Sequence, residues 1–540
     1  MYVPLLGRLG WLDWPVIATS FALAWVEFIV SVITALLPSS VLDFFAVATT
    51  TMYSLFTTNP VALSSTGDNV SNDSTAEESY HPKYTYLVRD LDISKEKYDL
   101  MIGLLNSTSI DQMCNLFGYD VEGRIVQTKD DYLLTVHRIV GRDDSARVPN
   151  GKVVYLHHGL LMSSDVWVTM LDKYSNLPFI LYDLGYDVWL GNNRGNKYSQ
   201  KHLHYKTHTE RFWDFSMDEF AIFDIPNTIE YILNATNKSK LTYVGFSQGS
   251  AQAFASVSVN SELNDKIEKL IAISPATTPH GLYSKFLDFF LKASPNIFFL
   301  LFSRKILMPS IFFWQRIMYP PLYDNMIDIS NYILFNWKSA NISKIQKLSS
   351  YAHLYSSTSV KTVVHWFQIM SSKNFQMYHD SYSKLSGLTP ISYPLKNIRV
   401  PIHLIYGDID SLVDIDVMKS QLPHKTTTAH AVHNHEHLDN LWGEDVYEQV
   451  FKQVLHALGE DENDVYTQLF RTYPSNTKLI EDIIEEEIEY VDEEKTLNNL
   501  HSYLKGSNID DIAEVEEPAE ATTSKYLPSH KQSSAGSVFV

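Results

Sequence analysis

The segment 245–249, with the sequence GFSQG, constrains the fold of this chain more than any other. It follows an apolar run at 241–244 and precedes an alanine-rich run at 251–255 that suits a helix. Glycine on both sides of a serine lets a strand turn sharply into a helix, because a Cβ at either position would clash with neighbouring backbone. The segment therefore predicts a strand–turn–helix unit that exposes the Ser247 hydroxyl at a helix N-terminus.

Apolar runs that suit strands recur along the chain at 153–156, 186–190, 241–244, 270–273 and 402–406. The segments between them are long enough for crossover helices, so we predict a mostly parallel sheet flanked by helices. Between residues 276 and 394 the alternation stops and an aromatic, helix-rich sequence takes over. We expect a helical cap inserted there, within a catalytic domain that covers residues 84–462.

A serine nucleophile needs a general base, and the base needs a carboxylate that orients it. On a strand–turn–helix unit of this kind, the acid follows the serine in sequence and the histidine follows the acid. The predicted strand 402–406 leads into an acidic loop. Asp410 is our first choice for the acid, with Asp408 next and Asp414 behind it.

Three histidines, His433, His435 and His437, compete for the role of the base. His437 immediately precedes a predicted helix at 440–458, so it falls in a loop at the carboxyl edge of the sheet, and we choose it. The alternating histidines are also compatible with a metal site, but their period of two suits a strand face better than a closed site. We therefore predict neither a metal nor a cofactor.

The negative oxygen that forms on a carbonyl under attack needs two backbone N–H donors. The residue after the nucleophile, Gln248, is one expected donor. The other comes from the loop after an early strand. The strand 153–156 is followed by the sequence HHGL, so Leu160 is the second expected donor.

Five ordered motifs together resemble the acid lipase family of α/β-hydrolases, at residues 158–161, 187–196, 215–219, 243–249 and 436–439. That family includes gastric and lysosomal lipases and fungal steryl ester hydrolases, and the match runs from about residue 110 to 458. The resemblance implies the α/β-hydrolase fold, a triad of Ser247, Asp410 and His437, and an oxyanion hole formed by Leu160 and Gln248.

Two departures distinguish the chain from the gastric and lysosomal members. Phe246 stands where those usually have a histidine, and an apolar N-terminal stretch stands where they have a cleaved signal peptide. Both departures resemble the membrane-bound fungal steryl ester hydrolases. The acid loop GDID also differs from the common Gly-Asn-Asp form, which leaves Asp408 and Asp410 both open.

The N-terminal residues 1–58 are predicted to be a membrane anchor, since two apolar runs at 16–37 and 41–56 flank a Pro-containing turn. A single span and a hairpin are both compatible with this pattern. Residues 59–83 are predicted to be a polar linker, and 463–540 an acidic, largely disordered tail. From Glu481 onward the chain holds 15 Asp and Glu against four Lys, which is about half of its net charge of −20.

The expected function is hydrolysis of a steryl ester to sterol and fatty acid at a lipid droplet or membrane. A triacylglycerol lipase with the same triad is the alternative, and a non-catalytic membrane binding protein is a third hypothesis. The acidic balance and the lack of a basic patch exclude nucleic acid as a partner. The lone cysteine, Cys114, favours a cytosolic catalytic domain, located at a lipid droplet or the endoplasmic reticulum.

Overall fold

The computed structural model describes residues 13–56, 94–141, 147–281, 283, 295–379 and 390–471. The chain divides into two compact units, residues 1–470 and 471–540, and the strands of the sheet all belong to the first. The predicted linker at 59–83 lies outside the described residues. So does most of the predicted acidic tail.

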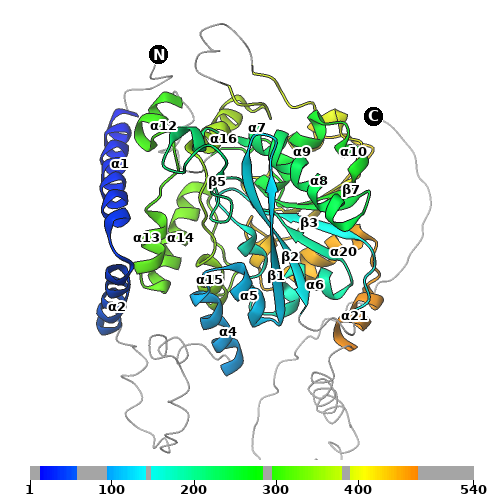
Figure 1. Ribbon diagram of the computed structural model, residues 1–540, viewed down its shortest axis with the longest axis horizontal. Helices are drawn as coiled ribbons and strands as arrows, with labels where there is room; N and C mark the ends of the chain where they lie inside the picture. Colours follow the sequence, from blue (N-terminus) through cyan, green and yellow to red (C-terminus); the bar gives the residue numbers. More distant parts are fainter. Residues whose placement is uncertain are drawn as a thin grey trace, which may run out of the picture. The chain divides into compact units, whose positions relative to one another are not determined.

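A nine-stranded sheet forms the centre of the fold (Figure 1). Its strands lie in the order β1-β2-β4-β3-β6-β7-β8-β9, with β5 paired to β2. The pairs β1–β2, β2–β4 and β2–β5 are antiparallel, and the other five are parallel. The mostly parallel α/β sheet predicted from the sequence is therefore confirmed. The strands are β1 Tyr119–Gln127, β2 Tyr132–Gly141, β3 Val153–His157, β4 Asp187–Leu190, β5 Lys201–His202, β6 Leu241–Phe246, β7 Ile267–Ile273, β8 Ile402–Gly407 and β9 Thr427–Val432.

Alternate residues of the central strands enter two separate hydrophobic cores. Along β3, Val154 and Leu156 pack with helices on one face of the sheet, whereas Val153 and Tyr155 pack with helices on the other. Every residue of β3 and β6 is buried, because both faces of a parallel sheet are covered. The first core includes α4 Lys95–Asn106, α5 Ile110–Leu116, α6 Leu177–Asp183 and α20 Lys452–Leu458, and the second α8 Ile225–Thr236 and α9 Gln248–Val259.

A set of helices lies between β7 and β8 in the sequence, where the insertion was expected, and we call it the cap. Leu348 of α15 packs in the first of the two hydrophobic cores, and Ile369 of α16 packs in the second. The cap helices are α12 Pro295–Phe302, α13 Ile311–Ile317, α14 Pro320–Phe335, α15 Lys344–Tyr351 and α16 Val360–Ser372.

Two helices, α1 Asp13–Leu36 and α2 Ser39–Phe56, precede the sheet and are separated at Pro38. Within the described part of the chain, only α1 is both long and apolar enough to cross a membrane, over Trp14–Ile33. Both helices lie beside the cap (Figure 1).

The C-terminal helices differ from the single helix expected at 440–458. The chain forms α19 Asp439–Trp442, breaks at Gly443, and resumes through a π-helical turn into α20. At the break, the Glu444 N–H donates to the Asn341 carbonyl of the cap, so a tertiary contact replaces the intrahelical one. A further helix, α21 Glu462–Arg471, buries Val465 and Leu469 in the first core, so packed structure continues beyond residue 462.

Candidate active site

Ser247 lies at the turn between β6 and α9 in a strained backbone conformation, with φ +52° and ψ −119°. Its N–H donates to the Ile273 carbonyl at 3.0 Å, which fixes the turn to the next strand. A Cβ on Gly245 would lie 2.6 Å from the Ser250 nitrogen, and one on Gly249 would lie 2.5 Å from the His157 oxygen. Only glycine fits at these two positions, as the sequence pattern predicted.

His437 lies between the hydroxyl of Ser247 and a carboxylate. Its Nε2 is 2.8 Å from Ser247 Oγ, and its Nδ1 is 2.6 Å from Asp410 Oδ2. Asp410 Oδ1 accepts the N–H of Leu412 at 2.9 Å, so the carboxylate is held from both sides. All three groups needed for nucleophilic attack thus meet at the carboxyl ends of β6 and β8 and the loop after β9. The arrangement lets His437 take a proton from Ser247 while Asp410 holds the Nδ1–H tautomer.

The competing acids are occupied elsewhere. Asp408 pairs with the exposed His433, with 2.8 Å between Oδ2 and Nδ1, and Asp414 caps the N-terminus of α18 Ile415–Gln421. His435 is buried and contacts Asn440 and Asp445. The three alternating histidines therefore point to three different partners. Among the described residues, no group of three or more His, Cys, Asp or Glu side chains is placed to hold a metal ion.

The loop after β3 lies directly against the serine. A Cβ on Gly159 would be 3.2 Å from Ser247 Cβ, so the loop that carries Leu160 approaches the nucleophile closely. Gln248 begins α9, where its N–H has no partner within the helix. Its side chain is fixed by the cap, since Trp366 Nε1 donates to Gln248 Oε1 at 2.7 Å.

The buried His158 supports the loop that carries Gly159. Burial lowers the pKa of His158 to about 4, so the ring is neutral at physiological pH. Its Nε2 accepts the N–H of Asn193 at 3.2 Å, and its Nδ1–H donates to the Gly159 carbonyl at 2.8 Å. The neutral ring therefore joins the loop to the segment that follows β4, and it does so in the tautomer that carries its proton on Nδ1.

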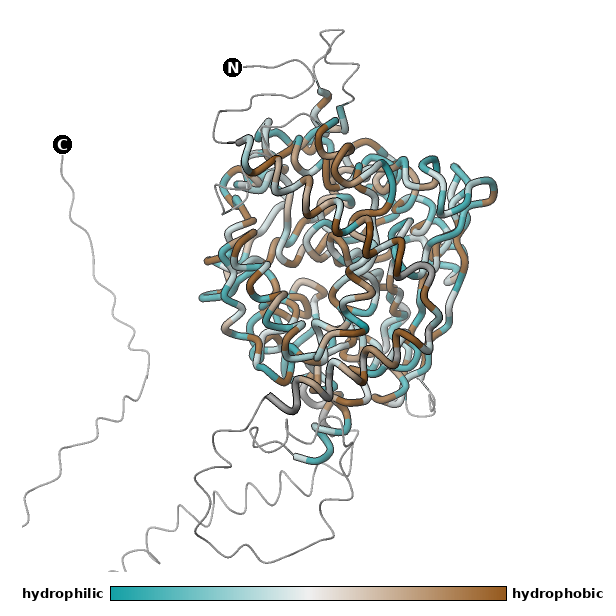
Figure 2. The backbone as a smooth tube through the Cα atoms, turned by 90° about the vertical axis from the view of Figure 1, so that its left-hand side faces the viewer, coloured by the Kyte–Doolittle hydropathy of each residue, from teal (hydrophilic) through white to brown (hydrophobic). Residues whose placement is uncertain are grey.

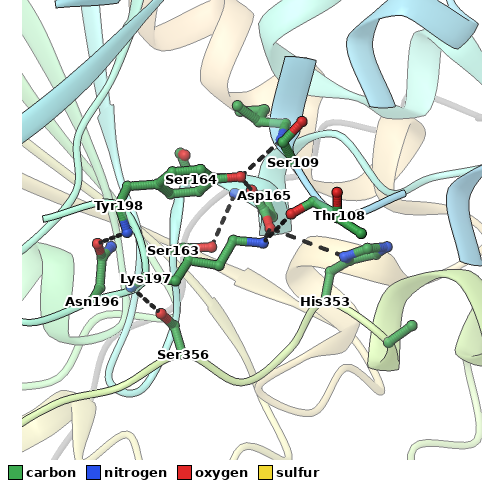
Figure 3. A network of polar contacts seen from close by, with 12 residues as sticks. Thr108, Ser109, Ser163, Ser164, Asp165, Asn196, Lys197, Tyr198, His353 and Ser356 are labelled. Carbon is green, nitrogen blue, oxygen red and sulfur yellow. Dashed lines mark hydrogen bonds and ion pairs between the residues drawn. The ribbon is translucent and has the colours of Figure 1, made fainter. Parts of the chain in front are cut away.

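A buried carboxylate lies at the far end of the same loop, next to the cap (Figure 3). Asp165 pairs with Lys197 and accepts the Tyr198 hydroxyl at 2.7 Å, and His353 of the cap lies 4.0 Å away. The backbone around Lys197 is also joined to the cap, because its N–H donates to Ser356 Oγ at 2.9 Å. None of these supports was predicted from the sequence, since their partners are far apart along the chain.

The cap also contacts the histidine loop directly, which the sequence did not predict. The Trp337 indole lies parallel to the His437 imidazole. The carboxylate of Glu436 accepts the backbone N–H groups of Lys338 and Ser339 at 2.7–2.9 Å. The Ser411 hydroxyl, next to the acid, donates to the Phe335 carbonyl. One short stretch of the cap thus contacts both the acid loop and the histidine loop.

Comparison with known proteins gives two family matches. The model of the partial alpha/beta-hydrolase lipase region matches residues 110–171, and that of the alpha/beta hydrolase fold matches residues 152–444. A probable lipase of Schizosaccharomyces pombe is 47% identical over 355 residues, which cover 65% of this chain and 80% of that protein. The gastric triacylglycerol lipase of Bos taurus is 34% identical over 375 residues, which cover 65% and 92%. The matched region includes the Ser247 turn, Asp410 and His437.

Proposed function

Because the chain belongs to the α/β-hydrolase fold family and is a carboxylic ester hydrolase related to lipases, we propose that it hydrolyses steryl esters with Ser247 as the nucleophile. The observation that carries the proposal is the continuous contact from Ser247 Oγ through His437 to Asp410. A serine, a histidine and a buried carboxylate in this order form the machinery of acyl transfer.

In the proposed reaction, Ser247 Oγ attacks the ester carbonyl carbon and His437 Nε2 takes the hydroxyl proton. The N–H groups of Leu160 and Gln248 stabilise the oxyanion. The tetrahedral intermediate collapses, the bond to the alcohol oxygen breaks, and His437 returns the proton to the departing sterol. Water activated by His437 then attacks the acyl-enzyme and releases the fatty acid. Asp410 orients the imidazole throughout and stabilises its positive charge.

Two features favour a steryl ester as the substrate. Phe246, which replaces the histidine usual in gastric and lysosomal lipases, packs against His437 with 5.3 Å between ring centroids and is fully buried. The N-terminal apolar helices would hold the enzyme at the surface of a water-insoluble ester. Both features resemble the membrane-bound fungal steryl ester hydrolases rather than secreted lipases.

A triacylglycerol is the second substrate class, and one observation favours it. The bovine relative, 34% identical over nearly its whole length, is named a triacylglycerol lipase. The discriminating experiment compares the turnover of cholesteryl oleate and triolein by the full-length protein in the same mixed micelles. A kcat/KM for triolein above that for cholesteryl oleate would replace our assignment with the second one.

Removal of the nucleophile tests the mechanism itself. Ser247→Ala is expected to abolish hydrolysis of both esters and labelling by a fluorophosphonate probe. Ser256→Ala is the matched control, because it lies on the same helix and its buried hydroxyl contacts no described polar group. Undiminished hydrolysis by the Ser247→Ala protein would end the proposal. A wild-type protein that does not react with the probe would instead support a non-catalytic binding protein.

We further propose that the enzyme acts at a lipid droplet or the endoplasmic reticulum membrane, with its catalytic domain in the cytosol. The buried, unpaired Cys114 is compatible with a reducing compartment. Protease added to sealed microsomes is expected to digest the catalytic domain. Protection of that domain until detergent is added would place it in the lumen instead.

A further inference from the structure

Both N-terminal helices pack onto the cap. Val16 and Ile17 of α1 form a small core with Ile297 and Leu301 of α12. On α2, the Thr49 hydroxyl donates to the Ile317 carbonyl at the end of α13. Figure 2 views the protein from this side. The cap therefore lies alongside both helices, rather than at one end of them.

A carboxylate in the middle of α1 is satisfied by the cap. Glu27 accepts the backbone N–H of Ser310 at 2.9 Å and also its hydroxyl, and Ser310 itself is only 2% exposed. Ser31, one turn further along α1, donates to the same carboxylate at 3.2 Å. A carboxylate at this position in an isolated apolar helix would lie near the centre of a bilayer, where it is costly. Contact with Ser310 removes that cost only while α1 stays on the cap.

Outside these contacts with the cap, α1 carries large apolar side chains that are exposed. Leu23, Trp25, Val26 and Phe28 are each more than half exposed, and the window Trp14–Ile33 is only 11% buried. On α2, Phe44, Phe45 and Val47 are exposed in the same way. A helix with its polar groups turned toward the protein and its apolar groups turned outward suits a lipid phase rather than water.

From this arrangement we propose that α1 and α2 lie in the plane of a lipid surface, seated on the cap through Glu27 and Ser310, and do not cross a bilayer. By length α1 is able to cross, since 24 residues extend about 36 Å. A crossing helix that kept its contacts would pull the cap and its polar loops into hydrocarbon, where unsatisfied backbone groups are excluded. The inference rests on the proposed membrane association, but not on the identity of the ester.

The contact between α1 and the cap also connects the lipid surface to the candidate active site. Phe298 of α12 packs edge-on against Phe367 of α16, with 5.1 Å between ring centroids. The neighbouring Trp366 holds the side chain of Gln248, and Leu161 of the Gly159 loop packs on the same α12–α16 cluster. Lipid contact at α1 is thus connected through the cap to the side chain of Gln248 and to Leu161, the residue after the other predicted oxyanion donor.

Depth measurements on the full-length protein test the proposal. Ala18, Ala22, Ile29 and Ile33 form one outward stripe of α1 that spans about 22 Å. Each is changed singly to Cys and labelled with bimane, while wild type is the control because Cys114 is fully buried. The protein is bound to phosphatidylcholine vesicles whose lipids carry bromine at two known depths. An in-plane helix gives the same depth for all four labels.

The alternatives give different patterns. Depth that rises to a maximum in the middle of α1 and falls toward its ends would show a crossing helix and overturn the proposal. Quenching of all labels by aqueous iodide would overturn membrane association itself. Because the readout needs no turnover, the Ser247→Ala protein is expected to give the wild-type pattern, which separates this inference from the proposed catalysis.

Variants of the polar contact complete the test. Glu27→Gln keeps an acceptor for the Ser310 N–H and is expected to retain a common depth for the stripe. Glu27→Leu removes the contact with Ser310, and the four labels on α1 are then expected to lie at different depths. The in-plane arrangement also predicts that wild type binds triolein droplets coated with phosphatidylcholine, because a monolayer cannot accommodate a crossing helix. Binding to vesicles but not to such droplets would contradict it.

Discussion

The indole of Trp337 stacks on the imidazole of His437, with ring centroids 4.9 Å apart and planes inclined by only 5°. Trp337 belongs to the cap and is 5% exposed, so the stack is shielded from water. In the proposed acyl transfer His437 becomes an imidazolium ion, and an aromatic face attracts a cation above it. The stack therefore favours the charged state that the proposed mechanism creates, in addition to fixing the plane of the ring.

Substitution of Trp337 tests this relationship. A cation–π contact contributes about 0.5–2 kcal/mol, and each 1.4 kcal/mol is about tenfold in rate. We expect Trp337→Leu to lower kcat for a soluble p-nitrophenyl ester by about 2- to 30-fold, and Trp337→Phe to lower it less. Trp25→Leu, on the exposed side of α1, is the control and should leave this activity unchanged. Equal losses in the Leu and Phe variants would argue against a role for the aromatic face.

Glu436 is expected to position His437 through the cap. Its carboxylate accepts two backbone N–H groups, so Glu436→Ala leaves both donors without their partner. Loss of such buried contacts costs about 1–3 kcal/mol. We predict a lower free energy of unfolding by that amount and a reduced kcat, with kcat partly restored in Glu436→Gln, which keeps an acceptor. A stability loss with unchanged kcat would show that Glu436 only anchors the cap.

The two candidate acids give a matched pair of variants. Asp410→Asn would favour the wrong tautomer of His437, and an equivalent change in a serine protease lowers kcat by about 10⁴-fold. Asp408→Asn changes the pair with the exposed His433 and leaves an oxygen that can still accept the N–H of Asn434, and it does not touch His437. We expect kcat to fall by about 10³- to 10⁴-fold in Asp410→Asn. In Asp408→Asn we expect kcat to stay close to the wild-type value. The reverse result would assign the acid to Asp408.

Local patterns along the chain were sufficient for five adjacent strands of the sheet, β4, β3, β6, β7 and β8, and for the separate residues of the candidate site. The glycines around Ser247 specify the turn by themselves, because no larger residue fits, and the apolar runs mark the buried parallel strands. The order of serine, acid and histidine then follows from the fold. Even so, the sequence left Asp408 and Asp410 both open, since two residues in one loop differ only in the direction of their side chains.

The contacts made by the cap could not be predicted, because they join segments that are distant along the chain. Trp337 is 100 residues from His437, and its own neighbourhood carries no motif. Glu27 interrupts an apolar segment of the sequence, and the residue that hydrogen-bonds to it, Ser310, is 283 residues away. The strands β1, β2, β5 and β9 were likewise missed, and β9 is a mostly exposed edge strand whose sequence lacks the apolar run of a central strand.

Buried histidines predict how the stability of the domain depends on pH. Burial lowers the pKa of His158 and of His137 to about 4, and their side chains are almost completely shielded. In the unfolded chain a histidine titrates near pH 6.5. Between about pH 4 and 6.5 the unfolded state therefore binds protons that the folded state does not. The stabilisation is fully present above pH 6.5 and decreases as the pH falls through this window.

Within that window, we expect each of these histidines to lower the free energy of unfolding by about 1.4 kcal/mol for every unit by which the pH falls. Burial raises the pKa of Asp224, which contributes with the opposite sign at the acidic end. Urea unfolding of the full-length protein between pH 4.5 and 7.5 measures how the free energy of unfolding changes with pH. His158→Gln should reduce that slope by the contribution of one histidine, about 1.4 kcal/mol per pH unit. Gln is the suitable replacement because it offers both a donor for Gly159 and an acceptor for Asn193. An unchanged slope in the variant would mean that His158 binds a proton as readily in the folded protein as in the unfolded chain, and that the Gly159 loop does not depend on the neutral ring.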